Sequence, residues 1–150
     1  MSPQELSNVI YSYYKSENAA HDILSDLRPT VLANIHKYKP IELCQVLNAF
    51  TECGLMDEEL IEIFTQSFKS NFESMNPMDC AMFYYCFTKL GFVGHGRFYK
   101  YLQKSVSKTI RAFEGPHLRL MFYQFDQEEK CRLNRGVRGR LIEHCKYLIR

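Results

Sequence analysis

The chain has 150 residues, of which 46% are apolar and 24% are charged, a composition typical of one soluble globular domain. No apolar run approaches the roughly 18 residues that a membrane span needs, which argues against an integral membrane protein. The formal net charge is only +2, so a strongly basic or acidic protein is also excluded.

The N-terminal residues resemble no targeting signal. They lack the basic and apolar regions of a secretory signal peptide, and the early acids Glu5, Glu17 and Asp22 do not suit an Arg-rich transit peptide. Two interpretations stay open: the protein works where it is made, or the numbering begins after a removed presequence.

Four prolines mark an internal repeat. Pro3, Pro40 and Pro77 are each 37 residues apart, and Pro116 follows after another 39. The first three are followed by an acid two residues later and by apolar residues at offsets of three, six, seven and ten. The fourth copy, which ends at Phe125, fits only if one residue is deleted, and it lacks the acid. Such self-similarity is the signature of a repeat protein.

The repeated pattern predicts a helix that begins at each proline. Proline suits the first helical position because its missing N–H would be unpaired there. The acids Glu5, Glu42 and Asp79 then fall at the third position, where a carboxylate meets free N–H groups and the positive end of the helix dipole. Ser2 and Asn76 are good N-caps, whereas those of the second and fourth copies, Lys39 and Gly115, are poorer.

Each first helix is followed by a second helical pattern. We expect the first helices of repeats two and three to end at Gly54 and Gly91, since glycine supplies the left-handed cap. Asp57 is positioned to cap the next helix. The apolar residues of the two second helices are Leu60, Ile63, Phe64, Phe68 and Phe72, and then Phe98, Tyr101, Leu102, Val106, Ile110 and Phe113.

Two second helices depart from the pattern. Pro29 falls inside the second helix of the first repeat, so this helix is either bent or begins late, at Pro29. Gly136 and Gly139 lie within the last pattern, residues 133–148, which we expect to be interrupted.

These elements predict an all-α fold, a short right-handed α-α solenoid of about four helix-turn-helix repeats in one domain, residues 1–150. The repeats span approximately 3–39, 40–76, 77–115 and 116–150. Twelve residues are expected to be largely buried: Leu43, Val46, Leu47, Phe50, Ile63, Phe64, Phe68, Phe83, Tyr84, Phe87, Leu102 and Val106.

The repeat resembles the organellar helical-repeat superfamily in its 37-residue length, its Pro-x-acid start and its Ala-Phe-Thr-Glu-Cys-Gly and Cys-Phe-Thr-Lys-Leu-Gly motifs. It is most similar to the heptatricopeptide repeat, a pentatricopeptide-like repeat related to octotricopeptide repeats and to those of FAST-kinase-type proteins. The resemblance covers residues 3 to 125. It implies a mitochondrial or plastid protein that binds RNA or is built into an organellar ribosome. The chain leaves no room for the RAP domain that ends longer members.

We expect no catalytic site, cofactor, metal site or small-molecule substrate. His95 lies in a Gly-His-Gly-Arg segment that lacks P-loop spacing and is read as an inter-helix turn. Glu143, His144 and Cys145 are neighbours in sequence, which do not face each other on a helix. The six cysteines form no C-x-x-C pair, so a zinc site is not indicated and buried, reduced thiols are expected.

The first helix of the third repeat, residues 78–90, is apolar on nearly every side. A helix without a polar face is buried on two sides. Either neighbouring repeats cover it, or part of it is a docking surface for a protein, since aromatic residues and Met are enriched at interfaces.

Charge is divided unevenly between the two parts of the chain. Residues 1–96 carry six Lys or Arg against twelve Asp or Glu, and residues 97–150 carry thirteen against five. In the second part, basic residues at steps of three and four residues form one stripe along a helix, and a second basic cluster follows it in the sequence. The contact residues that we expect are Arg97, Lys100, Lys104, Lys108 and Arg111 in the stripe, and Arg132, Arg135, Arg138 and Arg140 in the cluster.

Such a basic end is typical of contact with an RNA backbone or with an acidic protein, although a solvated face that balances the acidic half would look the same. With the resemblance, it favours a non-catalytic subunit of a mitochondrial ribosome in the matrix that touches RNA phosphates and neighbouring subunits. The alternative is a protein scaffold, such as an accessory subunit of a respiratory or ATP-synthase complex.

Overall fold

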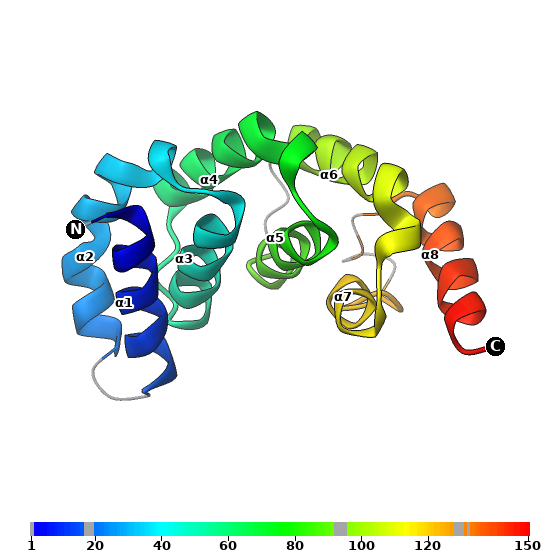
Figure 1. Ribbon diagram of the computed structural model, residues 1–150, viewed down its shortest axis with the longest axis horizontal. Coiled ribbons are helices and arrows are strands. Elements are labelled where there is room, and N and C mark those ends of the chain that lie inside the picture. Colours follow the sequence, from blue (N-terminus) through cyan, green and yellow to red (C-terminus); the bar gives the residue numbers. More distant parts are fainter. Residues whose placement is uncertain (1, 17–19, 92–95, 128–130, 132) are drawn as a thin grey trace. The chain divides into compact units, whose positions relative to one another are not determined.

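The computed structural model describes residues 2–16, 20–91, 96–127, 131 and 133–150. These residues form helices joined by turns and contain no strand, which confirms the all-α prediction (Figure 1). The α-helices are α1 Pro3–Lys15, α2 Ala20–Asn34, α3 Pro40–Glu52, α4 Glu58–Asn71, α5 Pro77–Lys89, α6 Gly96–Thr109, α7 Gly115–Met121 and α8 Arg135–Leu148. Short 3₁₀ turns η1 Ile35–Lys37, η2 Phe72–Ser74 and η3 Ile110–Ala112 follow α2, α4 and α6.

The first three repeats begin as the sequence predicts, with proline at the first helical position and an acid at the third. In α1, Glu5 N donates to Ser2 Oγ (3.2 Å) and Ser2 N donates to Glu5 Oε2 (2.7 Å). The same two bonds join Asn76 and Asp79 in α5. In α3, Lys39 supplies no side-chain cap, but its N–H donates to Glu42 Oε2 (2.8 Å). These hydrogen bonds, the one from the Ser2 backbone above all, lower the pKa of Glu5.

The fourth repeat differs by one position. Here α7 begins at Gly115, with Glu114 as its N-cap and Pro116 at its second position, so the expectation of Gly115 as N-cap was wrong. Counted from Gly115 and not from Pro116, the apolar residues Leu118 and Met121 have the offsets of three and six that the other repeats show. The fourth copy is one residue short when counted from Pro116 because its proline lies one position later in the helix. His117 stands where the other repeats have an acid, and its Nδ1 accepts from Glu114 N (2.9 Å).

The glycines end the first helices as expected. Gly54 and Gly91 have φ angles of +70° and +67°, the left-handed conformation that glycine adopts at little cost. After α3, Gly54 N donates to Thr51 O (3.2 Å) and Leu55 N donates to Phe50 O (2.9 Å), which satisfies two of the last carbonyls.

The second helices differ from expectation at two places. The helix α2 is continuous on both sides of Pro29, so the alternative that it begins late, at Pro29, was wrong, and a bend at Pro29 stays a prediction. The helix α8 runs unbroken through Gly136 and Gly139, so the expected interruption was wrong. Each interior glycine costs about 1 kcal/mol, but burial of Val137 and Leu141 against the rest of the fold offsets that cost.

Contacts group the chain into two compact units, residues 1–71 and residues 72–150, which we call the N-terminal and C-terminal units. In the N-terminal unit, α1 packs on α2 and α3, and α3 packs on α4. Arg28 joins α2 to the start of α4, because its Nη2 lies 2.8 Å from Asp57 Oδ2 and 2.7 Å from Glu59 Oε2. Asp57 also accepts from Leu60 N (2.9 Å), as its predicted capping role requires.

In the C-terminal unit, α5 packs beside α7 and against α6, and α8 packs on α6, α7 and η3 (Figure 1). Its core is aromatic: the ring centroids of Phe87 and Phe98 are 4.3 Å apart, and those of Phe83 and Phe87 are 5.9 Å apart. Of the twelve residues expected to be buried, eleven are buried, and Ile63 is only half-buried.

Replacing Phe50 or Phe87 with Ala is expected to lower the free energy of unfolding by about 3–5 kcal/mol, since each ring is at most 1% exposed and its loss leaves a cavity. Chemical denaturation followed by circular dichroism measures the change. Tyr147→Ala is the control because Tyr147 is 70% exposed, so it should change stability by less than about 0.5 kcal/mol. Equal effects for all three variants would contradict the described packing.

Replacing His117 with Glu is expected to stabilise the protein by about 0.3–1 kcal/mol, because a carboxylate then accepts the Glu114 N–H and complements the dipole of α7. The opposite change at the equivalent position of α1, Glu5→Gln, should lower stability. Urea midpoints at pH 7 measure both, and a His117→Glu variant with a lower midpoint would count against the assigned register of α7.

Candidate nucleic-acid interface

The five cations of the predicted stripe are exposed on α6 and η3. Arg97, Lys100, Lys104 and Lys108 lie on α6 at steps of three, four and four residues, and Arg111 lies on η3. The opposite side of α6 is held in the core by its apolar residues, which include Phe98, Leu102 and Val106. Burial of one side thus orients the basic side toward solvent. From Arg97 to Lys108 the row is about 16 Å long.

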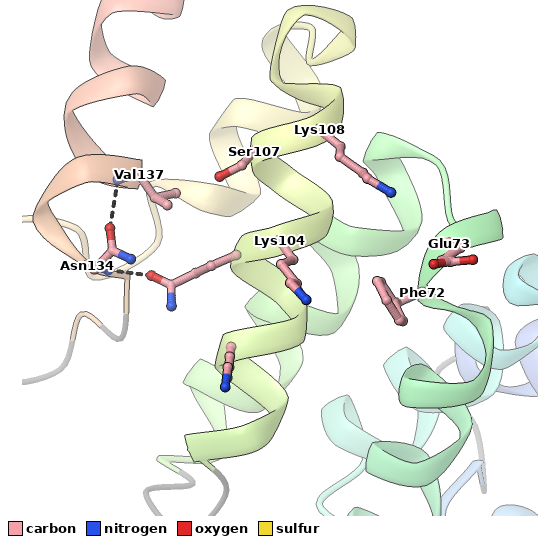
Figure 2. Close-up of a pocket in the computed structure, with 9 residues that line it drawn as sticks. Phe72, Glu73, Lys104, Ser107, Lys108, Asn134 and Val137 are labelled. Carbon is pink, nitrogen blue, oxygen red and sulfur yellow. Dashed lines mark hydrogen bonds between the residues drawn. The ribbon is translucent and has the colours of Figure 1, made fainter.

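An open groove runs over this side of α6. Its volume is about 460 Å³, and it is lined by Phe72, Glu73, Lys100, Gln103, Lys104, Ser107, Lys108, Asn134 and Val137. Figure 2 shows Asn134 and Val137 on one side of α6, Phe72 and Glu73 on the other, and Lys104 and Lys108 between them. We call the groove together with the predicted stripe the basic surface.

The start of α8 is fixed beside α6 by hydrogen bonds. Asn134 N donates to Gln103 Oε1, and Asn134 Oδ1 caps the helix by accepting from Val137 N (2.8 Å). Arg140 Nη2 donates to the carbonyl oxygen of Ser107 (3.1 Å). Gln103 and Ser107, the two residues of α6 that accept these bonds, adjoin Lys104 and Lys108 in the sequence. The two bonds therefore bring the N-terminal part of α8 to the edge of the groove.

The predicted arginine cluster is brought to the stripe only in part. Arg140 contacts α6 directly and is exposed. Arg135, the first residue of α8, is exposed. Arg138 is half-buried, and its Nε has no hydrogen-bond partner in the described part of the chain. Arg132 lies outside the described residues.

The local charge on the basic surface is positive. Three lysines line the groove against one acid, Glu73. Neither α6 nor α8 has an acid in its first turn. The N-terminus of α8, at Arg135, adds the positive end of a helix dipole. Such a surface can hold phosphate or carboxylate groups electrostatically, and lysine side chains act there as flexible point charges.

Sequence reasoning missed six of the nine described residues that line the groove. Gln103 and Ser107 lie three residues after Lys100 and Lys104, so a helical wheel could have found them. Phe72, Glu73, Asn134 and Val137 come from η2 and the start of α8, and no sequence pattern indicates that these elements flank α6.

Of the three sequence neighbours Glu143, His144 and Cys145, the first two make contacts within the fold. His144 Nε2 lies 2.7 Å from the carbonyl oxygen of Phe113, and its ring stacks on Tyr147. Glu143 pairs with Lys146 (3.3 Å). His95 lies outside the described residues.

All six cysteines are free thiols, but only Cys44, Cys80 and Cys86 are buried, so the expectation of buried thiols was half right. Burial raises the pKa of Cys80 to about 11. In the described ranges, no group of three or more His, Cys, Asp and Glu side chains could hold a metal ion. No described helix is both long and apolar enough to cross a membrane.

Comparison with protein families, with curated proteins and with solved structures finds no match to this chain. The resemblance to organellar helical repeats therefore stays a prediction from the sequence.

Replacing Asn134 with Ala is expected to destabilise α8 by about 1 kcal/mol, because the Val137 N–H loses its capping acceptor. Amide hydrogen exchange of α8 should speed up, while that of α5 should not change. Asn8→Ala, at an exposed position within α1, is the control and should leave exchange in α8 unchanged.

Proposed function

We propose that the protein is a non-catalytic subunit of a large mitochondrial assembly, a mitochondrial ribosome, and that its basic surface contacts RNA phosphates. The observation that carries the RNA contact is the exposed row of cations on α6, with Arg140 of α8 beside it. The assembly and the compartment are supported by the resemblance to organellar helical repeats alone.

The chemistry of the basic surface suits a nucleic-acid backbone. A row of cations about 16 Å long can follow several successive phosphates, whereas one small anion would need a single enclosed site. Phosphate contacts fix position but do not read bases, so the surface is expected to bind unrelated RNA sequences with similar affinity.

The proposal includes the architecture. The two helix pairs of each unit would stack as parts of one short right-handed α-α solenoid. Equivalent starts of α1, α3, α5 and α7, at intervals of 37, 37 and 38 residues, support the stacking of equivalent repeats.

The second candidate is a protein scaffold, an accessory subunit of a respiratory or ATP-synthase complex. The observation that favours it is the division of charge, because an acidic N-terminal part and a basic C-terminal part can each match a neighbouring subunit of opposite charge.

Salt-dependent RNA binding tests the proposal. A variant in which Arg97, Lys100, Lys104 and Lys108 are all Gln should bind RNA more weakly, and the slope of log affinity against log salt should fall by about three units, at ~0.7–0.9 per lost phosphate contact. These four side chains are exposed, so the fold should persist. Fluorescence anisotropy with two unrelated RNA oligonucleotides at several salt concentrations measures the slope.

The matched control replaces Lys15, Lys37, Lys39 and Lys69 of the N-terminal unit with Gln, which changes the net charge equally. It should keep the slope of the unmodified protein. Equal losses in both variants would mean that only total charge matters. Normal RNA binding by the α6 variant, together with failure to enter its native complex, would favour the scaffold.

A further inference from the structure

The structure resolves how the apolar helix α5 is covered. Phe83, Tyr84 and Phe87 are at most 1% exposed, so neighbouring helices bury most of its surface. One line along the helix stays partly open to solvent: Met78 and Lys89 are exposed and Met82 and Tyr85 are half-buried, at helical steps of four, three and four residues.

The same line continues onto α7. With Gly115 as the first residue of α7, the positions equivalent to Met82 and Tyr85 are Leu120 and Tyr123. The rings of Tyr85 and Tyr123 meet edge to face, with centroids 4.9 Å apart. Together the two helices line a groove of about 710 Å³, which we call the α5–α7 groove, and Arg119 lies at its side.

The repeat does not require apolar residues on this line. At the position of Met82, α1 has Asn8 and α3 has Gln45. At the position of Tyr85, α1 also has a tyrosine, Tyr11, and α3 has Asn48. The repeat itself therefore accounts for an aromatic residue at the second position, but the apolar Met82 and Leu120 need an explanation other than the packing of the repeat.

The charges of the α5–α7 groove indicate the kind of occupant. Among the described residues, Arg119 is the one charged residue that lines the groove, and it is exposed with no ion-pair partner in that part of the chain. Lys89 lies at the end of the line, 5.6 Å from the centroid of the Tyr85 ring. No acid among the described residues lines the groove. An occupant should thus bring apolar side chains for the floor and a carboxylate for Arg119.

We propose that the α5–α7 groove docks an amphipathic helix of a partner protein, with apolar anchors at steps of three or four residues and an acid that pairs with Arg119. The described chain offers no strand to which an extended peptide could add, and a groove between two adjacent helices suits a third helix. From Met78 to Tyr85 the open line is about 10 Å long, enough for two turns of such a helix. Methionine side chains adapt to the shape of a partner.

A polyanion fits this groove less well than it fits the basic surface. Among the described residues, the α5–α7 groove is lined by one cation and the groove over α6 by three lysines, and no lining residue is common to both. Apolar side chains in the floor gain free energy by burying apolar surface, which a phosphate backbone cannot supply. The inference stands whether or not RNA binds to α6.

Site-specific photo-crosslinking in the native assembly tests the inference. Benzoylphenylalanine in place of Tyr123 samples the groove, and the same group in place of Gln66, exposed on α4, is the control. Mapped cross-links from position 123 should fall in a partner segment that has apolar residues at helical spacing and an Asp or Glu among them. Cross-links to RNA, to a second copy of this chain, or no more than from position 66 would overturn the proposal.

Two further variants separate docking from folding. Met82→Gln with Leu120→Gln places at both positions a residue that α3 already carries there, so the helices should form as before, as circular dichroism can check. In this double variant, the yield of the cross-link from position 123 to the partner segment should fall at least tenfold. Arg119→Glu should also lower the yield about tenfold, and Arg119→Lys should keep most of it. Unchanged yields in the first two variants would overturn the proposal.

RNA affinity and its salt slope, measured on the same variants, distinguish the two proposals. Substitution of the groove residues Met82 and Leu120 should leave both quantities unchanged, whereas the α6 variant should change both and keep the cross-link at position 123. If the groove variants lowered RNA affinity instead, the groove would be part of the RNA contact and the docking proposal would be wrong.

Discussion

A carboxylate at the third position of a helix is the contact from which most of this structure follows. In α1, α3 and α5 it accepts the N–H of the residue before proline, so the backbone is fixed where the helix begins. Glu42 and Asp79 do this while buried, where an unpaired charge would be costly. Once the first residue is fixed, helical periodicity decides which side chains enter the core and which stay open. The side chains that α5 contributes to the α5–α7 groove are a consequence of that register.

This constraint also explains which predictions from the sequence succeeded. Helix starts at Pro3, Pro40 and Pro77 and helix ends at Gly54 and Gly91 depend on local chemistry, so a single sequence was enough to place them. The error at α8 has a different origin. Intrinsic propensity disfavours interior glycine, but tertiary burial of Val137 and Leu141 outweighs it, and burial cannot be read from a window of sequence. For α2, the alternative of a start at Pro29 was wrong because the helix continues on both sides of the proline. The start of α7 was misplaced because proline moved from the first to the second position.

The candidate interface shows the same limit. The row from Arg97 to Lys108 could be found from spacing because it lies on one helix. Its neighbours could not, because Glu73 and Asn134 come from elements that reach α6 only through the fold. The bond from Arg140 to the Ser107 carbonyl is a tertiary contact of this kind, and it gives Arg140 a definite position beside the stripe.

The two surfaces of the C-terminal unit have opposite physical characters. On α6, burial of one side leaves cations on the other, and attraction there acts over distance and weakens with salt. Between α5 and α7, the described lining of the groove is mainly apolar and includes one cation, Arg119. Hydrophobic binding there depends on surfaces that fit and touch each other, and it does not act over distance. Because none of the described residues lines both grooves, occupation of one does not use up the other. Under the two proposals, charge on α6 would draw the protein to a polyanion, and the α5–α7 groove would then hold it against a protein neighbour.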